Sequence, residues 1–174
     1  MYGLGADARS AAAVERLVAL RGREEGKPIL VLVADVEMAA VVAEDIPLPA
    51  RRLARRFWPG PLTLVLPARD GLPAPLTAGT GTIGVRVSGH PLAAALVARF
   101  GGPVTAPSAN PPGAVPPRRL DEARAYFGER VTYVDGGELA GGASTVAAIE
   151  GDGVRVLRAG PVTEAALVAA LAER

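Results

Sequence analysis

Short apolar runs alternate with helix-prone segments along this chain, and this alternation constrains the fold more than any other feature of the sequence. The runs expected as strands are Pro28–Val33, Leu62–Leu66, Thr82–Val87 and Pro103–Ala106. Near the C-terminus, Ser144–Ile149 and Val154–Arg158 flank the turn Glu150–Gly153, which is typical of a hairpin. Strands that alternate with helices and end in a hairpin predict one α/β domain with a mixed sheet.

Helical periodicity and capping residues place helices between these runs. We expect helices over Ala8–Leu20, from the cap Asp35 to about Ala43, and over Pro49–Phe57, Leu92–Phe100, Leu120–Phe127 and Glu164–Leu171. Asp7 is the expected N-cap of the first helix and Thr163 that of the last. A further strand is expected at Val131–Val134, and a long loop at Ala68–Gly81.

The composition suits a folded domain and excludes several chemistries. With 174 residues, of which 49% are hydrophobic and 21% charged, the chain can bury a core. The absence of cysteine excludes disulfides, thiolate zinc sites and a cysteine nucleophile, and the single histidine argues against a Ser-His-Asp triad. The formal charge of +1 argues neither for nor against a nucleic-acid partner. The apolar runs are too short to span a bilayer and no signal peptide is recognisable, so we expect a cytoplasmic protein without membrane contact.

The segment Gly102–Gly113, with the sequence GPVTAPSANPPG, is the strongest candidate for a ligand-binding loop. Its prolines restrict the backbone on both sides, so that Ser108 and Asn110 are presented at the end of a short strand. Ligands of open α/β sheets bind outside the carboxyl ends of strands. The sequence leaves open whether these two side chains bind a ligand or only cap backbone groups of a turn.

Other polar side chains also fall at strand ends or in glycine-rich turns. They are Arg21, Arg23, Lys27, Thr63, Arg86, Ser144, Thr145 and Arg158. Each has a structural alternative, such as a charge that complements a helix dipole. Arg86 is the hardest to explain in this way, because a charge inside an apolar strand needs a partner or a wet cavity. Together these groups predict a basic crevice lined by hydroxyls that suits phosphate and carboxylate, although the chain has no P-loop.

Three features have structural interpretations that we favour over functional ones. The arginines of the segment Arg51–Arg56 are interpreted as a solvated helix face rather than as a patch for RNA phosphates. Trp58 is expected to pack against the core rather than to stack on a base. His90, just before a helix-starting proline, is expected to cap the helix or to form a local hydrogen bond rather than to act in catalysis.

Short motifs follow one another in a fixed order along essentially the whole chain. They are Tyr2–Ala8 (YGLGADA), Arg21–Arg23 (RGR), Lys27–Ile29, Phe57–Thr63 (FWPGPLT), Gly84–Val87, Ala106–Asn110 (APSAN), Ser144–Val146 (STV) and Leu157–Gly160 (LRAG). In residue type and in order, this set resembles the motifs of the YrdC-type threonylcarbamoyl-AMP synthase family. The resemblance implies a twisted open mixed sheet flanked by helices, with a concave basic cavity.

The resemblance also implies an activity, that of an L-threonylcarbamoyladenylate synthase. Such a nucleotidyltransferase forms threonylcarbamoyl-AMP and pyrophosphate from L-threonine, bicarbonate and ATP, for the threonylcarbamoyladenosine modification of tRNA. Magnesium, double-stranded RNA and tRNA-modification proteins are the implied cofactor and partners. A carboxylated threonine nitrogen already carries an oxyanion, so no covalent nucleophile from the protein is expected.

Site residues are carried over motif by motif. Arg21, Arg23, Ser108, Asn110, Ser144 and Arg158 would contact ATP, and Thr63 and Arg86 would lie near threonine and the carbamoyl group. Arg21 and Arg23 would in addition stabilise charge during the reaction. Arg21 stands where the family has lysine, which keeps the charge and changes its geometry.

The start of the chain departs from the family's pattern. The family has a strand and a Pro-Thr-(Asp/Glu)-Thr segment before YGLG, whereas Met1 precedes Tyr2 in this sequence. We therefore expect residues 1–174 to form a single YrdC-like domain that lacks the first strand and the threonine-binding N-terminal segment, which would weaken its activity. Two alternatives stay open, namely a non-catalytic RNA-binding module that uses the basic cavity and a carbamoyl-adenylate-handling domain like that of hydrogenase maturation proteins.

Overall fold

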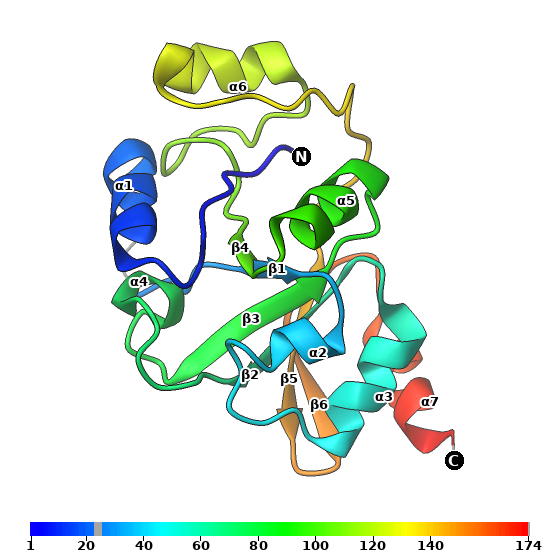
Figure 1. Cartoon of the computed structure of the whole chain (residues 1–174). Helices are drawn as coiled ribbons and strands as arrows, with labels where there is room; N and C mark the ends of the chain where they lie inside the picture. The colour runs from blue at the N-terminus through cyan, green and yellow to red at the C-terminus, as the bar shows by residue number, and fades with distance from the viewer. Residues whose placement is uncertain (23–25, 174) are drawn as a thin grey trace.

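The computed structural model describes residues 1–22 and 26–173, and its centre is a six-stranded sheet (Figure 1). The strands are β1 (Val31–Val33), β2 (Leu62–Pro67), β3 (Thr82–Val87), β4 (Val104–Thr105), β5 (Thr145–Glu150) and β6 (Gly153–Arg158). Their order in space is β4-β1-β3-β2-β5-β6, in which β1 and β3, and likewise β2 and β5, pair in parallel. The other neighbours are antiparallel. This mixed sheet confirms the fold class predicted from the sequence.

Seven helices surround the sheet in the described part of the chain. They are α1 (Ala11–Arg21), α2 (Val36–Ala39), α3 (Leu48–Phe57), α4 (Ala74–Thr77), α5 (Pro91–Phe100), α6 (Leu120–Phe127) and α7 (Glu164–Ala172), with a short 3-10 turn at Gly128–Arg130. Figure 1 shows α3 and α7 packed together near the C-terminus, while α1, α5 and α6 surround the N-terminal segment at the opposite end. In the described part of the chain, no helix is long and apolar enough to cross a membrane.

Strand β3 explains how a charged residue is accommodated inside the sheet. Its side chains alternate between the two faces, so that Ile83, Val85 and Val87 are buried in the core. Arg86 lies on the opposite face, next to Leu32 of the parallel neighbour β1. One face of the sheet is thus packed, and the other carries a charge.

Two hydrophobic clusters hold the molecule together, and α1 contributes Val14 to the larger one and Leu17 to the smaller one. The larger one packs α2, α3 and α7 against the sheet and includes the fully buried Leu53 and Leu167. The smaller cluster joins α1, α6 and the N-terminal segment Met1–Asp7, and we call these three parts together the α1/α6 lobe. The buried members of this cluster are Leu4, Leu17, Ala109, Ala123 and Phe127. The space between these clusters is where the sheet presents its charged face.

The predicted N-cap of the first helix is wrong. Helix α1 starts at Ala11, because the Ser10 hydroxyl accepts a hydrogen bond from the Ala13 amide at 3.3 Å. The Asp7 carboxylate instead accepts from the Arg9 amide and pairs with its guanidinium at 3.0 Å. At the C-terminus, the Thr163 hydroxyl accepts from the Ala166 amide, which confirms the cap predicted for α7.

Other local predictions also need correction. Val131–Val134 forms no strand, and it runs as irregular chain beside the smaller cluster, against which Val131 and Tyr133 pack. Val131 and Tyr133 are half-buried and alternate with exposed residues, which produces a strand-like pattern without a strand. The expected long loop at 68–81 contains the short helix α4, and α2 ends already at Ala39.

Candidate active site

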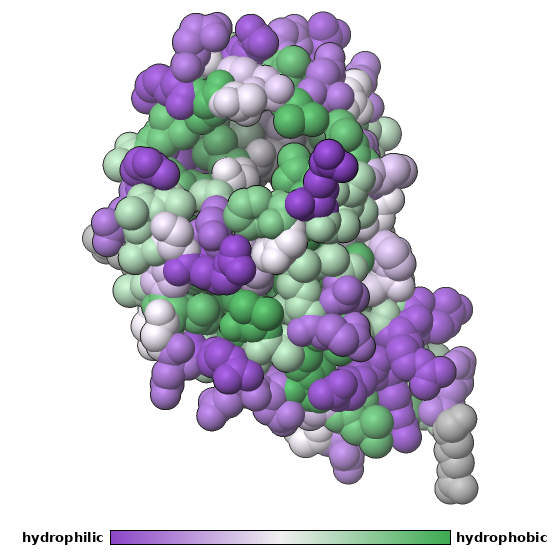
Figure 2. Space-filling model, viewed as in Figure 1, coloured by the Kyte–Doolittle hydropathy of each residue, from purple (hydrophilic) through white to green (hydrophobic). Residues whose placement is uncertain are grey.

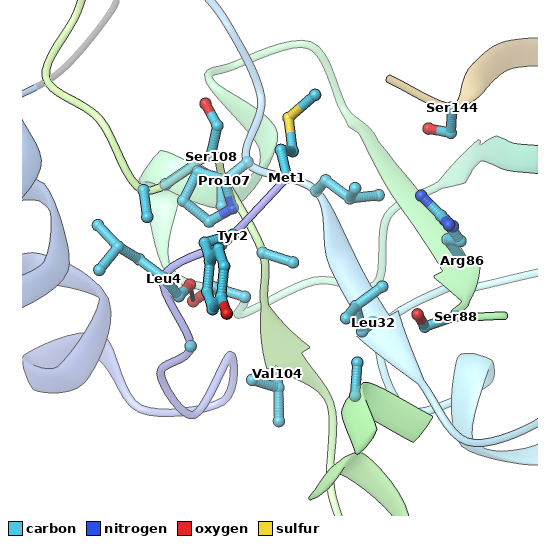
Figure 3. A pocket seen from close by; sticks show the side chains of 18 of the residues that line it. Met1, Tyr2, Leu4, Leu32, Arg86, Ser88, Val104, Pro107, Ser108 and Ser144 are labelled. Carbon is cyan, nitrogen blue, oxygen red and sulfur yellow. Dashed lines mark hydrogen bonds between the residues drawn. The ribbon is translucent and has the colours of Figure 1, made fainter. Parts of the chain in front are cut away.

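A cavity of about 1490 Å³ lies between the sheet and the α1/α6 lobe. Strands β1 to β3, helix α5, the loop after β4 and the segment before β5 all contribute to its walls. Figure 2 shows the hollow in the upper part of the molecule, with hydrophobic and hydrophilic residues at its rim. Figure 3 shows Arg86 and Ser144 on one side of the pocket, and Pro107 and Ser108 on the other.

The sheet side of the cavity carries a connected polar network. The Thr63 and Ser144 hydroxyls share a hydrogen bond of 2.7 Å and both residues are buried. Arg158 donates to the Ser144 carbonyl at 2.9 Å and to its hydroxyl at 3.2 Å. Strand pairing causes this arrangement, since Leu62 lies beside Thr145 in β5 and Val146 lies beside Arg158 in β6. The network holds both hydroxyls in fixed positions at the cavity wall.

Arg86 extends from β3 toward Ser144 (Figure 3) and donates from Nε to the Gly60 carbonyl at 2.7 Å. Desolvation, followed by the nearby positive charge of Arg158, lowers the pKa of Arg86 below its ordinary value. Desolvation likewise lowers the pKa of Arg158. Within residues 1–22 and 26–173, neither guanidinium forms an ion pair with an acidic side chain. An anionic ligand between them would relieve this repulsion.

The opposite wall is formed by the proline-rich loop after β4. Arg21, at the end of α1, donates from Nε to the Ser108 carbonyl at 3.0 Å and lies 3.5 Å from its hydroxyl. The N-terminal segment pairs with this loop, because the Leu4 amide donates to the Pro107 carbonyl at 2.9 Å. The loop therefore has little freedom to move, as its prolines predict.

Asn110 lies behind this wall and is not among the residues that line the cavity. Its Nδ2 donates to the carbonyls of Pro111 and Ala114, and its Oδ1 is buried and has no hydrogen-bond partner among the described residues. The amide thus shapes the turn that presents Ser108.

Most of the site residues predicted from the sequence meet in this one cavity. Arg21, Lys27, Thr63, Arg86, Ser108, Ser144 and Arg158 all line it. Arg23 lies outside the described residues. Thr145 is buried, and its hydroxyl donates to the Val162 carbonyl at 2.7 Å, which is a structural role.

The structure shows where the three features that we interpreted as structural lie. The Arg51 and Arg52 guanidiniums donate to the carbonyls of Ile46 and Leu171, and neither residue lines the cavity. Trp58 packs against the larger cluster and donates from Nε1 to the Leu62 carbonyl. His90 occupies the N-cap position of α5 without a side-chain cap bond, and it lines the cavity instead.

Sequence reasoning missed two contributions to the cavity. Tyr2 lines it, and its hydroxyl reaches the segment before β5, a contact between residues 2 and 137 that no local pattern reveals. Leu92, Leu96 and Phe100 also line the cavity from α5, although each is about 40% exposed or more. Their spacing along one helix face is a signal that the sequence did contain.

The described residues contain no group of three or more His, Cys, Asp or Glu side chains that could hold a metal ion. Apart from His90 and from Asp7, whose carboxylate pairs with Arg9, the ionisable and hydroxyl side chains that line the cavity are guanidiniums, an amine and hydroxyls, which bind anions. Together with the mixed sheet, they define an α/β domain with a cavity whose chemistry suits an anionic ligand.

The sequence model of one family, described as "Telomere recombination" (Sua5_yciO_yrdC), matches residues 1–160, and the chain belongs to this family. The threonylcarbamoyl-AMP synthase of Halorhodospira halophila is 40% identical over 141 residues, which cover 81% of this chain and 74% of that protein. That of Bacillus subtilis is 38% identical over 167 residues, which cover 94% of this chain and 48% of that protein.

A solved structure shows the same fold. The crystal structure of P. abyssi Sua5 complexed with L-threonine matches with a TM-score of 0.90 at 36% identity, over 98% of this chain and 51% of that one. The chain thus spans about half the length of the B. subtilis and P. abyssi proteins. Because the relatives are named as synthases, the comparisons do not favour an RNA-binding module.

Proposed function

We propose that the cavity makes threonylcarbamoyl-AMP and pyrophosphate from L-threonine, bicarbonate and ATP, as a nucleotidyltransferase for the threonylcarbamoyladenosine modification of tRNA. The observation that carries this proposal is the pair of guanidiniums, Arg86 and Arg158, which face a cavity wall of buried hydroxyls and have no acidic partner in the described chain. All three substrates are anionic or carry a carboxylate. The names of the relatives and the threonine complex of P. abyssi Sua5 support the same assignment.

The proposed binding mode follows the two walls. Thr63 and Arg86 lie near threonine and the carbamoyl group, and Ser144 and Arg158 lie around the nucleotide. Arg21 and Ser108, on the opposite wall, contact the phosphates, and Arg23 is a further phosphate ligand. Asn110 acts on the nucleotide through the loop that it supports.

The reaction itself needs positioning and charge stabilisation more than protein nucleophiles. The threonine amine attacks the carbon of bicarbonate, so that an N–C bond forms, a C–O bond breaks and water leaves. One oxygen of the resulting carbamate then attacks the α-phosphorus of ATP. A new P–O bond forms, the bond from the α-phosphorus to the bridging oxygen of the β-phosphate breaks, and pyrophosphate leaves with the electron pair. Fixed arginines align these groups and stabilise the negative charge of the transition state.

Magnesium is proposed to reach the cavity on the ATP phosphates. The described residues offer no acidic cluster for a resident ion, and Mg²⁺ in such reactions is commonly held by substrate phosphates. Because tRNA is the final acceptor of the threonylcarbamoyl group, we place the activity in the cytoplasm, with tRNA and tRNA-modification proteins as partners. We also propose that residues 1–174 act as a single domain.

The test combines binding with product formation. The purified chain is titrated calorimetrically with MgATP, with and without L-threonine and bicarbonate, and pyrophosphate and threonylcarbamoyl-AMP are quantified by mass spectrometry. We expect ATP to bind, threonine and bicarbonate to tighten the binding, and product to form only when all three are present.

Two results would contradict the proposal. A folded chain that binds neither ATP nor threonine rules out the cavity as the substrate site. A chain that binds ATP but forms no threonylcarbamoyl-AMP reduces the function of residues 1–174 to nucleotide binding. An Arg86→Met variant serves as the control for activity from contaminating enzymes.

A further inference from the structure

The segment Gly136–Gly142, with the sequence GGELAGG, closes one side of the cavity, and we call it the strap. Figure 1 shows the chain descending from α6 past α5 to the sheet in this region. The strap contains no helix or strand, yet Gly136, Leu139 and Ala140 line the cavity. Ser144 of the polar network follows almost directly along the chain. Whatever occupies the cavity therefore lies beside the strap.

One end of the strap is held by a phenol from the other end of the chain and by the Asp135 carboxylate, which accepts from the Gly137 amide at 2.8 Å. The Tyr2 hydroxyl accepts a hydrogen bond from the Gly136 amide at 3.0 Å and donates to the Gly137 carbonyl at 2.7 Å. It also lies 3.1 Å from an oxygen of Asp135. Desolvation raises the pKa of Tyr2 above its ordinary value, so that the phenol stays protonated and able to donate.

Packing at this end is tight. A Cβ atom at position 136 would lie 3.3 Å from His90 Cε1 and 3.8 Å from the Tyr2 hydroxyl. Gly136 is thus held between the imidazole ring and the phenol. Gly137, with a φ of 72°, adopts a left-handed conformation that other residues rarely accept.

The middle of the strap is held by Arg118, which precedes α6. The Leu139 amide donates to the Arg118 carbonyl at 2.9 Å, and Arg118 Nε donates to the Leu139 carbonyl at 3.2 Å. Beyond this point come Gly141, with a φ of 126°, and Gly142. The strap therefore begins and ends with a pair of glycines, and a few hydrogen bonds attach it to the rim of the cavity.

We propose that the strap is a lid of the cavity, that the Tyr2 hydroxyl is its latch at Gly136 and Gly137, and that after their release it opens about Gly141 and Gly142 to let a nucleotide-sized anion pass. Glycine pairs permit large backbone rotations, and opening breaks no helix or strand. Tyr2 is in this view a positioning residue, which acts on the ligand through the strap. The proposal rests on the proposed function only for the identity of the ligand.

The first test measures opening without any ligand. The chain has no cysteine, so Leu139→Cys introduces a single thiol on the strap, and its rate of reaction with Ellman's reagent reports the open population. Adding Tyr2→Phe removes only the hydroxyl, and we expect the reaction to become about 3- to 10-fold faster, as the loss of a hydrogen bond or two predicts. Arg118→Met, which removes the other side-chain contact, is expected to act in the same direction.

Tyr133→Phe is the matched control. Its hydroxyl donates to the Gly128 carbonyl at 2.7 Å, outside the strap, so the thiol should react at the unchanged rate. Equal rates in the Tyr2→Phe and Tyr133→Phe backgrounds would overturn the latch. So would a faster reaction in both, because it would mean a general loosening of the fold.

The second test separates a latch from a ligand contact. With a fluorescent ATP analogue in stopped flow, we expect Tyr2→Phe to raise the association and dissociation rate constants by a similar factor and to leave Kd nearly unchanged. A rise in the dissociation rate constant alone would make Tyr2 a ligand contact and overturn the gating role. If no nucleotide binds at all, the proposed function fails, whereas the thiol rates still decide whether the strap opens.

Discussion

Arg86 places a positive charge in the cavity, and its burial there contributes little to the stability of the fold. It is desolvated on the cavity face of β3, repelled by Arg158, and held by one hydrogen bond to the Gly60 carbonyl. A residue of this kind contributes little to folding because its charge lacks an acidic partner in the described chain. Its environment indicates that it is kept for a ligand.

From this we predict that Arg86→Met separates activity from stability. Methionine fills similar volume without the charge, so the midpoint of thermal unfolding should change by only a few degrees. Synthesis of threonylcarbamoyl-AMP should fall by about 100-fold or more, as for the loss of one oxyanion donor. The exposed Arg155→Met is the control in both assays. A loss of activity that merely parallels a loss of stability would contradict this assignment.

The Thr63–Ser144 hydrogen bond predicts a coupled pair at the same scale. Thr63→Val keeps the shape but leaves a buried hydroxyl without its 2.7 Å partner, which should lower the free energy of unfolding by about 1 kcal/mol. Ser144→Ala should have a similar cost, and the double variant should cost less than the sum. Urea denaturation of the four proteins of this cycle measures the coupling. Strict additivity would show that the two hydroxyls do not interact.

At the scale of single elements, helix α1 depends on a cap that is not the one predicted. Ser10→Ala should lower the free energy of unfolding by about 1 kcal/mol, whereas Ser10→Asp should restore it, because either side chain can accept from the Ala13 amide. Chemical denaturation followed by circular dichroism checks both variants. If the free energy of unfolding of Ser10→Ala were unchanged, the Ser10 cap would be contradicted and Asp7 would again be the candidate N-cap.

The Asp7–Arg9 pair makes the attachment of the N-terminal segment to β4 sensitive to pH. The side-chain hydrogen bond from Arg9 is the largest cause that lowers the pKa of Asp7, and Asp7 also forms a bridge with Val104. Because the folded pKa lies below the unfolded value, the stabilisation is present above the unfolded value and is lost as pH falls through the folded one. The stability difference between the natural chain and Asp7→Asn should therefore shrink in acid. A difference that stays constant between pH 7 and pH 3 would refute the coupling.

At the scale of the whole molecule, the two hydrophobic clusters predict unequal stability. The α1/α6 lobe has the smaller cluster, so its amides should exchange hydrogen faster than those of β2, β3 and β5. Substrates bind between the two clusters in the proposed function, and they should slow exchange in the lobe more than in the sheet. Hydrogen exchange followed by mass spectrometry, with and without ATP and threonine, measures both effects. Uniform protection throughout would show a single cooperative unit.

The sequence by itself determined the class of the fold and most of the site. The alternation of strands and helices predicted the mixed sheet, because the periodicity of apolar side chains depends on neighbouring residues and can be read from the sequence alone. Arg86 stood out because a charge within an apolar strand violates that periodicity. Ser108 stood out because prolines on both sides restrict the loop that carries it.

Only the tertiary structure decided the rest. The strand expected at Val131–Val134 is irregular chain, since its apolar residues pack on a helix lobe rather than in a sheet. The contact of Tyr2 with Gly136 and Gly137, and the approach of Arg86 to Arg158, join residues far apart in the sequence. Such contacts depend on how the strands and lobes are arranged in space, which local propensity and periodicity do not encode.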